Sequence, residues 1–373
     1  MNIGMALSGG GYRATVFHLG VLAWFARTGH LGDVKFLSTV SGGSICVGLI
    51  YAAAGNEWPN DDEYSREVVP KIKKWLTTVD LQKSIIIRGI FSPFKTRADD
   101  LAKLMEKHFE MKGTLQDIPS APRLIINATT YETGKLFRFE QRRMTDYLLG
   151  GVKEPQIKLS EAVAASAGFP VGIGPLVLKP ADYDWFSFEN GLLQNPIPTP
   201  PFSRLHLWDG GVYDNLADEP LFNPGAGWRK GVDFLVVSDA SGLFDDHEAY
   251  SPGVEPLKRL LDIATSQVRA VRARALVGQM ENDLGAGVFL QIDNPVEKIM
   301  RRALEKGPIK KPAPNGALNR VLDDDDVEKA ARMPTHIHDL KESEFNLLFR
   351  QGFEVANATY YGYINADKWL NYN

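Results

Sequence analysis

The chain has 373 residues, of which 44% are hydrophobic and 24% charged, and it carries a formal net charge of −4. This length and composition suit a globular enzyme built as one elaborated α/β domain or as two smaller ones. The slight acidic excess argues against a sequence-independent nucleic-acid binder, which carries a basic excess. The single cysteine, Cys46, excludes an intrachain disulfide framework.

The cellular location is predicted from three features of the sequence: its apolar stretches, its N-terminal segment and its cysteine count. No stretch approaches the ~20 consecutive apolar residues that a membrane-spanning helix needs. Glycines of functional appearance begin at residue 9, before a signal peptide would end. One cysteine also suits a reducing compartment. We therefore expect a cytoplasmic protein.

Strands and helices alternate from the start of the chain. Apolar runs predict buried strands at 3–7 and 34–40, and a wide apolar stripe predicts a helix at 14–27. Residues 45–54 are small and apolar on nearly every side, which indicates a helix buried in the middle of a domain. The chain therefore opens as an α/β layered fold.

The segment from about 56 to 118 differs in character, because charges become dense and a helix is predicted near 68–79. We interpret it as a cap over a site or as an insertion. After it the sequence predicts core strands at 124–128 and 135–139, a small-residue helix at 159–167 and a loop over 180–201.

Two further strands, at 204–208 and 234–237, are each followed by an aspartate, Asp209 and Asp239. Together with the elements before them, these strands predict an α/β fold with a mainly parallel sheet.

The last third of the chain is predicted to be mostly helical. A long helix covers about 256–282, and the sequence ends in an amphipathic helix over 340–361, with a surface loop at 306–317 between them. Residues 323–326 are four aspartates that either open a helix or form a solvated run. The long helix carries an arginine-rich face that either forms salt bridges or binds a phosphate or a partner: Arg269, Arg272 and Arg274.

Ser41 has the setting of a nucleophile. It lies between the strand 34–40 and the buried helix, and the tight turn that exposes such a serine needs small residues two positions to either side. Gly43 meets this need, whereas Thr39 stands where glycine is usual. Ser44, one turn inside the helix, is the rival nucleophile. A serine that merely caps the helix is the other alternative.

Gly9, Gly10 and Gly11 follow the first strand and precede a helix. Successive glycines let backbone amides point at one spot and form an anion-binding nest, which beside a serine would be an oxyanion hole. Arg13 would add positive charge at its mouth. The letters G-x-G-x-x-A from residue 9 also fit a dinucleotide fingerprint, but Asp33 precedes the second strand instead of ending it.

Asp209 is the best-placed general base. It ends an apolar strand, and Gly210 and Gly211 after it would let the backbone pass close to the serine turn. A desolvated carboxylate has a raised pKa and is a stronger base than in water. An Asp-Gly pair that only forms a turn is the alternative, and Asp239 is the reserve candidate.

None of the seven histidines lies in a convincing catalytic turn. His18 falls on the first helix, where a packing role is expected. His336 and His338 alternate before the last helix without the carboxylate or cysteine spacing of a metal site.

With these three motifs in this order, the sequence resembles the patatin-like phospholipases. That family has a G-G-G-x-[RK] oxyanion loop, a G-x-S-x-G elbow and a D-G-[GA] aspartate, which here fall at Gly9 to Arg13, at Ser41 and at Asp209. Further likeness lies in 127–134 and 165–170, and the resemblance covers about 1–55 and 120–245. Thr39 and Gly168 depart from the family pattern without removing a catalytic group.

The resemblance implies a three-layer α/β/α fold with helical insertions in one domain, 1–373. Its catalytic core would span about 1–55 and 120–245, and 246–373 would be a C-terminal elaboration with a closing helix. It also implies a lipid acyl hydrolase of the phospholipase A or lysophospholipase type. Ser41 would form an acyl-enzyme and Asp209 would be the general base, with no histidine, metal or organic cofactor.

Two other functions stay open: a thioesterase or small-ester esterase on the same scaffold, and a non-catalytic lipid-binding regulatory protein. The physiological lipid and the oligomeric state also stay open. A cluster of apolar residues flanked by basic ones either contacts the surface of an anionic bilayer or packs on the core. Its members are Ile85, Ile86, Ile87, Ile90, Phe91 and Phe94, with Lys83, Arg88, Lys95 and Arg97 around them.

Overall fold

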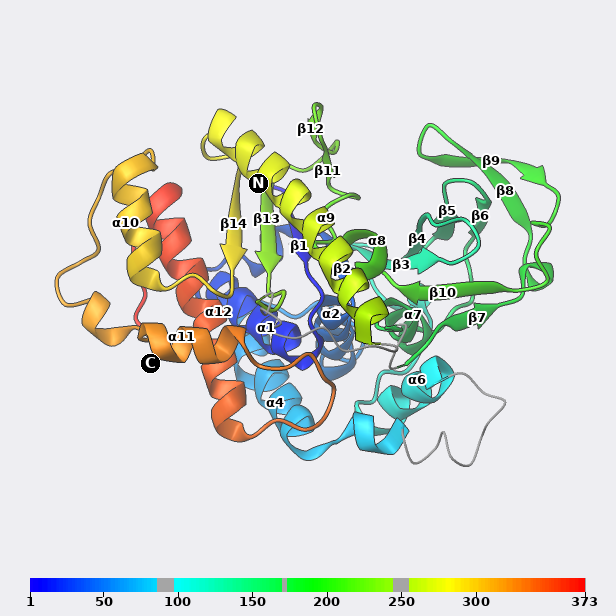
Figure 1. The fold of residues 1–373 in the computed structure, drawn as a ribbon, viewed down its shortest axis with the longest axis horizontal. Helices are drawn as coiled ribbons and strands as arrows, with labels where there is room; N and C mark the ends of the chain where they lie inside the picture. Colours follow the sequence, from blue (N-terminus) through cyan, green and yellow to red (C-terminus); the bar gives the residue numbers. More distant parts are fainter. Residues whose placement is uncertain (86–96, 170–172, 244–254, 373) are drawn as a thin grey trace.

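A computed structural model describes residues 1–85, 97–169, 173–243 and 255–372, and it is built around a mixed β-sheet with helices on both faces (Figure 1). Five neighbouring strands run parallel, in the order β14 (Gly287–Gln291), β13 (Phe234–Asp239), β1 (Ile3–Leu7), β2 (Val34–Val40) and β3 (Arg123–Thr130). Their carboxyl ends therefore lie at one edge of the sheet, where open α/β sheets bind ligands. The predicted α/β fold with mainly parallel central strands is confirmed.

The other strands of the large sheet are antiparallel to their neighbours. Beyond β3 the sheet continues through β4 (Leu136–Glu140), β5 (Arg143–Asp146), β6 (Gly150–Lys153), β8 (Trp185–Glu189) and β9 (Leu192–Ile197). Off this path, β10 (Leu205–Asp209) pairs with β3 and with β7 (Leu176–Leu178). A separate two-stranded sheet joins β11 (Phe222–Asn223) and β12 (Gly227–Trp228).

Two strands share one edge of β3, and this arrangement positions the site. β4 occupies the opposite edge, since Ile125 and Thr129 each pair with β4 while also pairing with β2 and with β10, respectively. On the shared edge, the last residue of β2, Val40, lies opposite Asn127, and the last residue of β10, Asp209, lies opposite Ala128. The carboxyl ends of β2 and β10 therefore meet head to head.

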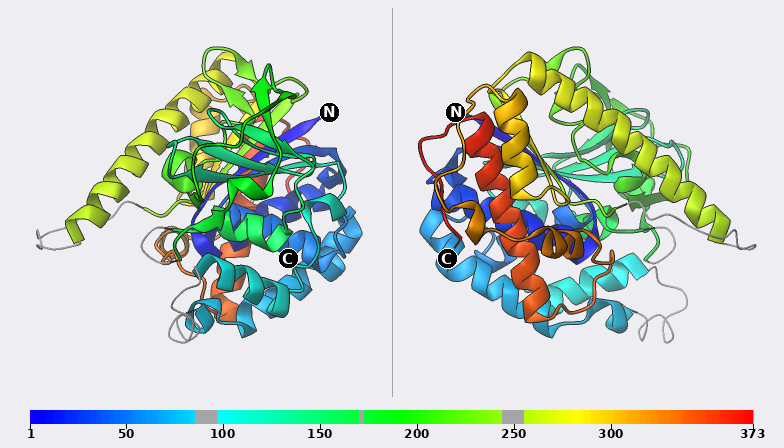
Figure 2. Two further views of the ribbon diagram at one scale, coloured as in Figure 1. Left: turned by 90° about the vertical axis from the view of Figure 1, so that its right-hand side faces the viewer. Right: turned by 60° about the vertical axis from the view of Figure 1, so that its left-hand side comes forward.

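The helices form two layers. One face of the sheet is covered by α1 (Gly11–Arg27), α2 (Gly42–Ala53), α7 (Leu159–Ser166), α10 (Val296–Lys306) and α12 (Glu342–Tyr363), and the other by α8 (Gly211–Asp214) and α9 (Glu255–Asn282), as Figure 2 shows. Because side chains alternate along a strand, Met5 and Leu7 of β1 join the larger core beneath α1, whereas Ala6 joins a smaller core with Leu276 of α9.

The segment predicted as a cap or insertion packs against the larger helical layer. It contains α3 (Asp61–Glu63), α4 (Val69–Thr78) and α6 (Arg97–His108), and α4 contacts α2 and α12. Ile72 and Leu76 of α4 are fully buried, and the Tyr64 hydroxyl donates to the carbonyl of Leu19 at 2.8 Å. The described residues of this segment are thus anchored to the core.

The C-terminal predictions are confirmed in their main features. The long helix is α9, the closing helix is α12, and the aspartate run opens α11 (Asp324–Ala331). There Asp323 is the cap, accepting a hydrogen bond from the amide of Asp326 at 2.9 Å.

The loop predicted over 180–201 is wrong, because most of this segment is the hairpin of β8 and β9. The hairpin turns at Asn190 and Gly191, whose φ angles are 51° and 81°. An Asn-Gly pair between strands is a strong hairpin signal. The sequence did not predict the hairpin because its strands are half exposed. They therefore lack the regular alternation of apolar and polar residues that marks a strand with one buried face.

Candidate active site

Ser41 occupies the sharp turn between β2 and α2. Its backbone has φ 49° and ψ −114°, and it is the N-cap of α2, yet its side chain makes no capping hydrogen bond. A non-glycine residue with positive φ is strained and is held only where the surroundings enforce it. The interpretation of Ser41 as an ordinary helix-capping serine is therefore not supported by its geometry.

The turn after Ser41 passes directly over β1. A Cβ atom on Gly43 would lie 2.3 Å from the carbonyl oxygen of Leu7, so only glycine fits there. The Gly43 amide donates to the carbonyl of Ser8 at 3.1 Å, which ties the turn to the start of the glycine loop. The small residue expected two positions after the serine is thus required by close backbone contact.

Asp209 faces Ser41 from the end of β10. Its side chain is buried and accepts a hydrogen bond from the amide of Gly211 at 2.7 Å. Burial raises the pKa of the Asp209 carboxyl to about 6, and the Gly211 amide and the nearby Ser41 side chain oppose the rise. Gly210 lies against Asn127 of β3, which fixes the aspartate turn beside the serine turn.

The glycine loop lies beside Ser41. A Cβ atom on Gly9 would approach the Ser41 Cβ to 3.2 Å, and one on Gly42 would approach the Gly11 amide nitrogen to 2.9 Å. Gly10 and Gly11 have φ angles of 141° and 59°, which glycine adopts readily. Among the residues that the structure describes, the amides of Gly10 and Gly11 donate no hydrogen bond to the protein.

Gly9, the first glycine of the loop, is different, because its amide donates to the carbonyl of Asn215 at 3.1 Å. The structure thus separates the predicted oxyanion residues into two with free amides, Gly10 and Gly11, and one that anchors the loop.

Arg13 lies behind the glycine loop and is only 4% exposed. Its guanidinium donates to the carbonyl of Ala240 at 3.1 Å and to the carbonyl of Met333. Burial lowers the pKa of Arg13 to about 10. The side chain therefore fastens the loop to the segment after β13 and to the segment before α12.

The rival serine, Ser44, is fully buried in a polar network. Its hydroxyl contacts the hydroxyls of Thr39 at 2.9 Å and Ser166 at 2.8 Å. Ser166 also accepts a hydrogen bond from the Ser41 amide at 3.0 Å and donates to the carbonyl of Asn127 at 2.6 Å. Ser44 thus supports the serine turn from behind, and Thr39, the departure from the family pattern, belongs to the same network.

Asp239, the reserve base, is fully buried in an ion pair. Its carboxylate accepts from Arg269 at 2.8 Å and 2.6 Å and from the Ser241 amide at 3.0 Å. Arg272 pairs with Asp214, Asp218 and Glu219 in the same way. The salt-bridged interpretation of the arginine-rich face is therefore confirmed for Arg269 and Arg272.

The three histidines considered from the sequence, His18, His336 and His338, take structural positions. His18 is fully buried, its Nδ1 lies 2.8 Å from the Ser238 hydroxyl and its Nε2 3.0 Å from the Ser8 carbonyl, and burial lowers its pKa to about 4. The packing role predicted for it is confirmed. His336 and His338 stack on each other, with ring centroids 3.3 Å apart, and the carbonyl of His336 accepts from the Tyr12 amide at 3.0 Å.

The dinucleotide alternative is not supported. Asp33 lies in a short 3₁₀ turn before β2, where its carboxylate contacts His30 Nδ1 at 2.8 Å. It is therefore at the wrong end of the strand to meet a ribose at the carboxyl edge.

Two predictions concern membranes and metals. Most of the apolar cluster near 85–94 lies outside the described residues, and Ile85, which is described, is buried. Within the described ranges, no helix has the length and apolarity to cross a bilayer. No group of three or more His, Cys, Asp or Glu side chains in the same ranges is placed to hold a metal ion.

One residue of the site escaped the sequence analysis. Asn215 contacts the glycine loop and the aspartate turn together, although it lies six positions after Asp209 in a segment that carried no assigned role. A single sequence carries no signal for it, because an asparagine six residues after an Asp-Gly-Gly turn is also what an ordinary helix end offers.

Comparisons with known proteins show which family has a sequence and a fold like those of this chain. The sequence model of the patatin-like phospholipases matches residues 5–221, more than half of the chain and all of the elements that carry the site. No curated protein sequence matches the chain.

Among solved structures, human GIVD cytosolic phospholipase A2 superposes with a TM-score of 0.53 at 15% identity, covering 97% of this chain and 59% of the human chain. The same human enzyme in complex with methyl gamma-linolenyl fluorophosphonate and terbium chloride gives a TM-score of 0.51 at 14% identity, with 97% and 58% covered. These likenesses concern the fold, and the chain spans about three fifths of the length of the human protein.

Proposed function

Because the chain belongs to the patatin-like phospholipase family, we propose that it is a lipid acyl hydrolase with Ser41 as nucleophile and Asp209 as general base. One observation carries the proposal: the carboxyl ends of β2 and β10 meet on one edge of β3, so that Ser41 adjoins the buried Asp209 carboxylate, whose pKa burial raises to about 6. A carboxylate with that pKa is ionised at neutral pH and is a better proton acceptor than one in water.

In the acylation step, the Ser41 oxygen attacks the ester carbonyl carbon while Asp209 accepts the hydroxyl proton. The carbonyl oxygen becomes an oxyanion, which the free amides of Gly10 and Gly11 would stabilise. Each such donor is typically worth about 2.7–4 kcal/mol in the transition state. The tetrahedral intermediate then breaks the bond to the alcohol, which leaves with the proton from Asp209.

In deacylation water is the nucleophile and the Ser41 oxygen is the leaving group. Asp209 accepts a proton from water as the water oxygen attacks the acyl carbon, and the Ser41 oxygen leaves and regains its proton. The fatty acid is released and the enzyme returns to its starting state. Ser41 also lies at the N-terminus of α2, where the helix dipole favours the negative charge that develops at its oxygen.

The substrate class in this proposal is a phospholipid or another lipid ester. A peripheral contact with a bilayer is part of the proposal, because such a substrate resides in a membrane or a lipid particle. The motifs support Ser41 as the nucleophile but do not specify the leaving group of the substrate, so an acyl thioester or a small soluble ester is the alternative on the same scaffold.

The test is lipid-product analysis on a panel of phospholipids, lysophospholipids, neutral lipids and acyl thioesters, for wild type beside Ser41→Ala. We expect Ser41→Ala to lose about 10³-fold or more of the activity, since removing a nucleophile removes the covalent route. Ser44→Ala tests the rival serine and should keep measurable hydrolysis. If Ser41→Ala hydrolyses esters as fast as wild type, the assignment of the nucleophile is wrong.

Labelling with a fluorophosphonate separates an enzyme from a non-catalytic lipid-binding protein. Such a probe is a rational choice because a fluorophosphonate binds the human phospholipase A2 of similar fold. Failure of the wild-type protein to react, together with the absence of any cleaved product, would favour the binding protein.

A further inference from the structure

Asn215 lies where the two halves of the site meet. It is the C-cap of α8, and its carbonyl accepts the Gly9 amide at 3.1 Å. Its side-chain Oδ1 is wedged between two glycines. A Cβ atom on Gly9 would be only 2.3 Å from this oxygen, and one on Gly211 would be 2.5 Å from it. One side chain therefore contacts both the glycine loop and the aspartate turn.

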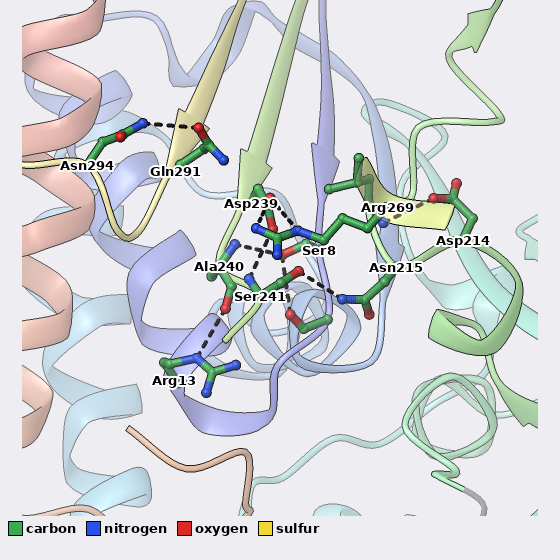
Figure 3. Close-up of polar contacts among 12 residues, drawn as sticks. Ser8, Arg13, Asp214, Asn215, Asp239, Ala240, Ser241, Arg269, Gln291 and Asn294 are labelled. Carbon is green, nitrogen blue, oxygen red and sulfur yellow. Dashed lines mark hydrogen bonds and ion pairs between the residues drawn. The ribbon is translucent and has the colours of Figure 1, made fainter. Parts of the chain in front are cut away.

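The amide group of Asn215 is itself held in place from the far side. Its Nδ2 donates to the Ser241 hydroxyl at 2.9 Å, and the Ser241 amide donates to Asp239 at 3.0 Å. Asp239 is ion-paired with Arg269 of α9. Figure 3 shows this row of side chains running from Arg269 through Asp239 and Ser241 to Asn215, with Ser8 bonded to the Ala240 amide beside it.

This row bears on the oxyanion donors. The Gly10 amide belongs to the peptide that follows Gly9, so its direction depends on how Gly9 is fixed. Donors to an oxyanion act only when they lie at hydrogen-bond distance from the position that the charged oxygen will take. An error of about 1 Å in such positions typically costs about 100-fold in rate.

We propose that Asn215 is a positioning residue, which sets the glycine loop and the aspartate turn in their working relation and is kept in its rotamer by Ser241 and Asp239. The inference rests on the function proposed above. It assigns no contact with substrate to Asn215. The side chain acts through Gly9 and Gly211.

The test measures the rate and the amplitude of reaction with a fluorophosphonate. In that reaction the Ser41 oxygen bonds to phosphorus, the phosphorus–fluorine bond breaks, fluoride leaves and Asp209 accepts the hydroxyl proton. The amplitude of labelling gives the fraction of protein molecules that are folded and able to react. The rate constant of labelling reports how well the reacting groups are positioned in each of those molecules. For Asn215→Ala we expect an unchanged amplitude and a rate constant about 10- to 100-fold lower. With a soluble ester, kcat should fall with little change in KM.

Asn357→Ala is the matched control. Asn357 is a buried asparagine far from the site that accepts from Trp24 Nε1 at 3.1 Å and donates to the Leu370 carbonyl at 3.0 Å. Its truncation removes the same buried amide and should lower the melting temperature, but each labelled site should react at the wild-type rate. A loss that is merely structural would make Asn215→Ala behave in this way.

Substitutions at Ser241 test the second half of the inference. Ser241→Ala removes the acceptor for the Asn215 amide and should slow labelling in the same direction, whereas Ser241→Thr keeps the hydroxyl and should restore most of the rate. Because both residues act through one contact, the double variant with Asn215→Ala should be hardly slower than Asn215→Ala alone.

The outcomes separate the two proposals. If wild type neither labels nor hydrolyses, the proposed function fails. If wild type labels and Asn215→Ala labels at the same rate per site, only the positioning role is overturned. A loss of amplitude in Asn215→Ala at an unchanged rate constant would also overturn it.

Discussion

Two buried aspartates end two strands of the same sheet, and their surroundings give them different properties. Asp209 ends β10 beside Ser41 and accepts a hydrogen bond from the Gly211 amide, and burial raises its pKa to about 6. Asp239 ends β13 and is ion-paired with Arg269. The Asp239 carboxylate is thus occupied by a guanidinium, whereas the Asp209 carboxylate lies beside a hydroxyl whose proton it could accept.

The comparison shows that strand position alone does not distinguish a base from a structural residue. Both residues were candidates from sequence because both follow apolar strands. The difference comes from α9, which starts beyond β13 and delivers Arg269 to Asp239 across the sheet edge. Substitutions at Asp209, or at Asp239 and its partner Arg269, therefore test whether the two carboxylates differ in this way.

The largest effect is expected when the Asp209 carboxylate is removed. Asp209→Asn keeps the size of the side chain but has no basic oxygen, so we expect ester hydrolysis to fall about 10³-fold or more. The measurement is kcat on a soluble ester. Asp146→Asn is the control, since Asp146 is a buried carboxylate of β5 that accepts from Thr130 and Thr133 at 2.7 Å each. Equal losses in the two variants would mean that the Asp209 effect is structural.

The next effect concerns Asp239 and is one of stability. Arg269→Leu leaves a fully buried carboxylate without its cation, and breaking one partner of a buried pair typically costs about 3–5 kcal/mol. Urea unfolding measures the loss. The double variant Arg269→Leu with Asp239→Asn should recover much of it, because no charge is then left unpaired. A single variant within about 1 kcal/mol of wild type would show that the pair adds little.

Asp209→Asn should stabilise the fold at neutral pH. The folded pKa of about 6 lies above the ordinary value of 3.8, so below pH 3.8 both folded and unfolded states are protonated and the carboxyl costs nothing. Between these values unfolding releases a proton, and the free energy of unfolding falls as pH rises. Above pH 6 the whole cost is present, up to about 3 kcal/mol at 1.36 kcal/mol per pKa unit.

Chemical denaturation of wild type and Asp209→Asn at pH 4 and pH 7.5 checks this expectation. The advantage of the variant should be small at pH 4 and largest at pH 7.5. An advantage that is independent of pH would indicate that the pKa of Asp209 is not raised.

The smallest effect is on the pH dependence of wild type itself. Because the base must be ionised, kcat/KM on a soluble ester should be level near pH 8 and fall about tenfold per unit below about pH 6. Asn357→Ala should keep this midpoint, since the contacts of Asn357 are with Trp24 and Leu370 and not with the aspartate turn. A midpoint near 4 would contradict desolvation as the source of basicity.

Much of the fold was predictable because β1 and β2 are short runs rich in apolar residues that are followed by glycine-containing turns. β1 and β2 begin and end at the predicted residues, and the glycine turns that follow them were recognised from their letters. The hairpin of β8 and β9 was missed because a half-exposed strand pair does not alternate regularly.

The sequence predicted the candidate reacting residues of the site, but not the residues that hold their turns in place. Ser41 and Asp209 stand in motifs whose residues must be small for the backbone to pass. The contacts of Asn215 and Ser166 depend on tertiary proximity, since each reaches across more than a hundred residues to another turn. The restraint on Arg13 also came from distant carbonyls, which a linear pattern does not encode.

The head-to-head pairing of β2 and β10 on one edge of β3 has a consequence for how the protein tolerates change. The two reacting groups are separated by almost half of the chain, yet the strands that carry them end opposite adjacent residues of β3, Asn127 and Ala128. Inserting two residues into β3 between these residues would push the groups apart by about 7 Å, at 3.3 Å per residue. The rate of ester hydrolysis would therefore report the register of β2 and β10 on β3 directly. A shift in this register should lower the rate more than it lowers the melting temperature.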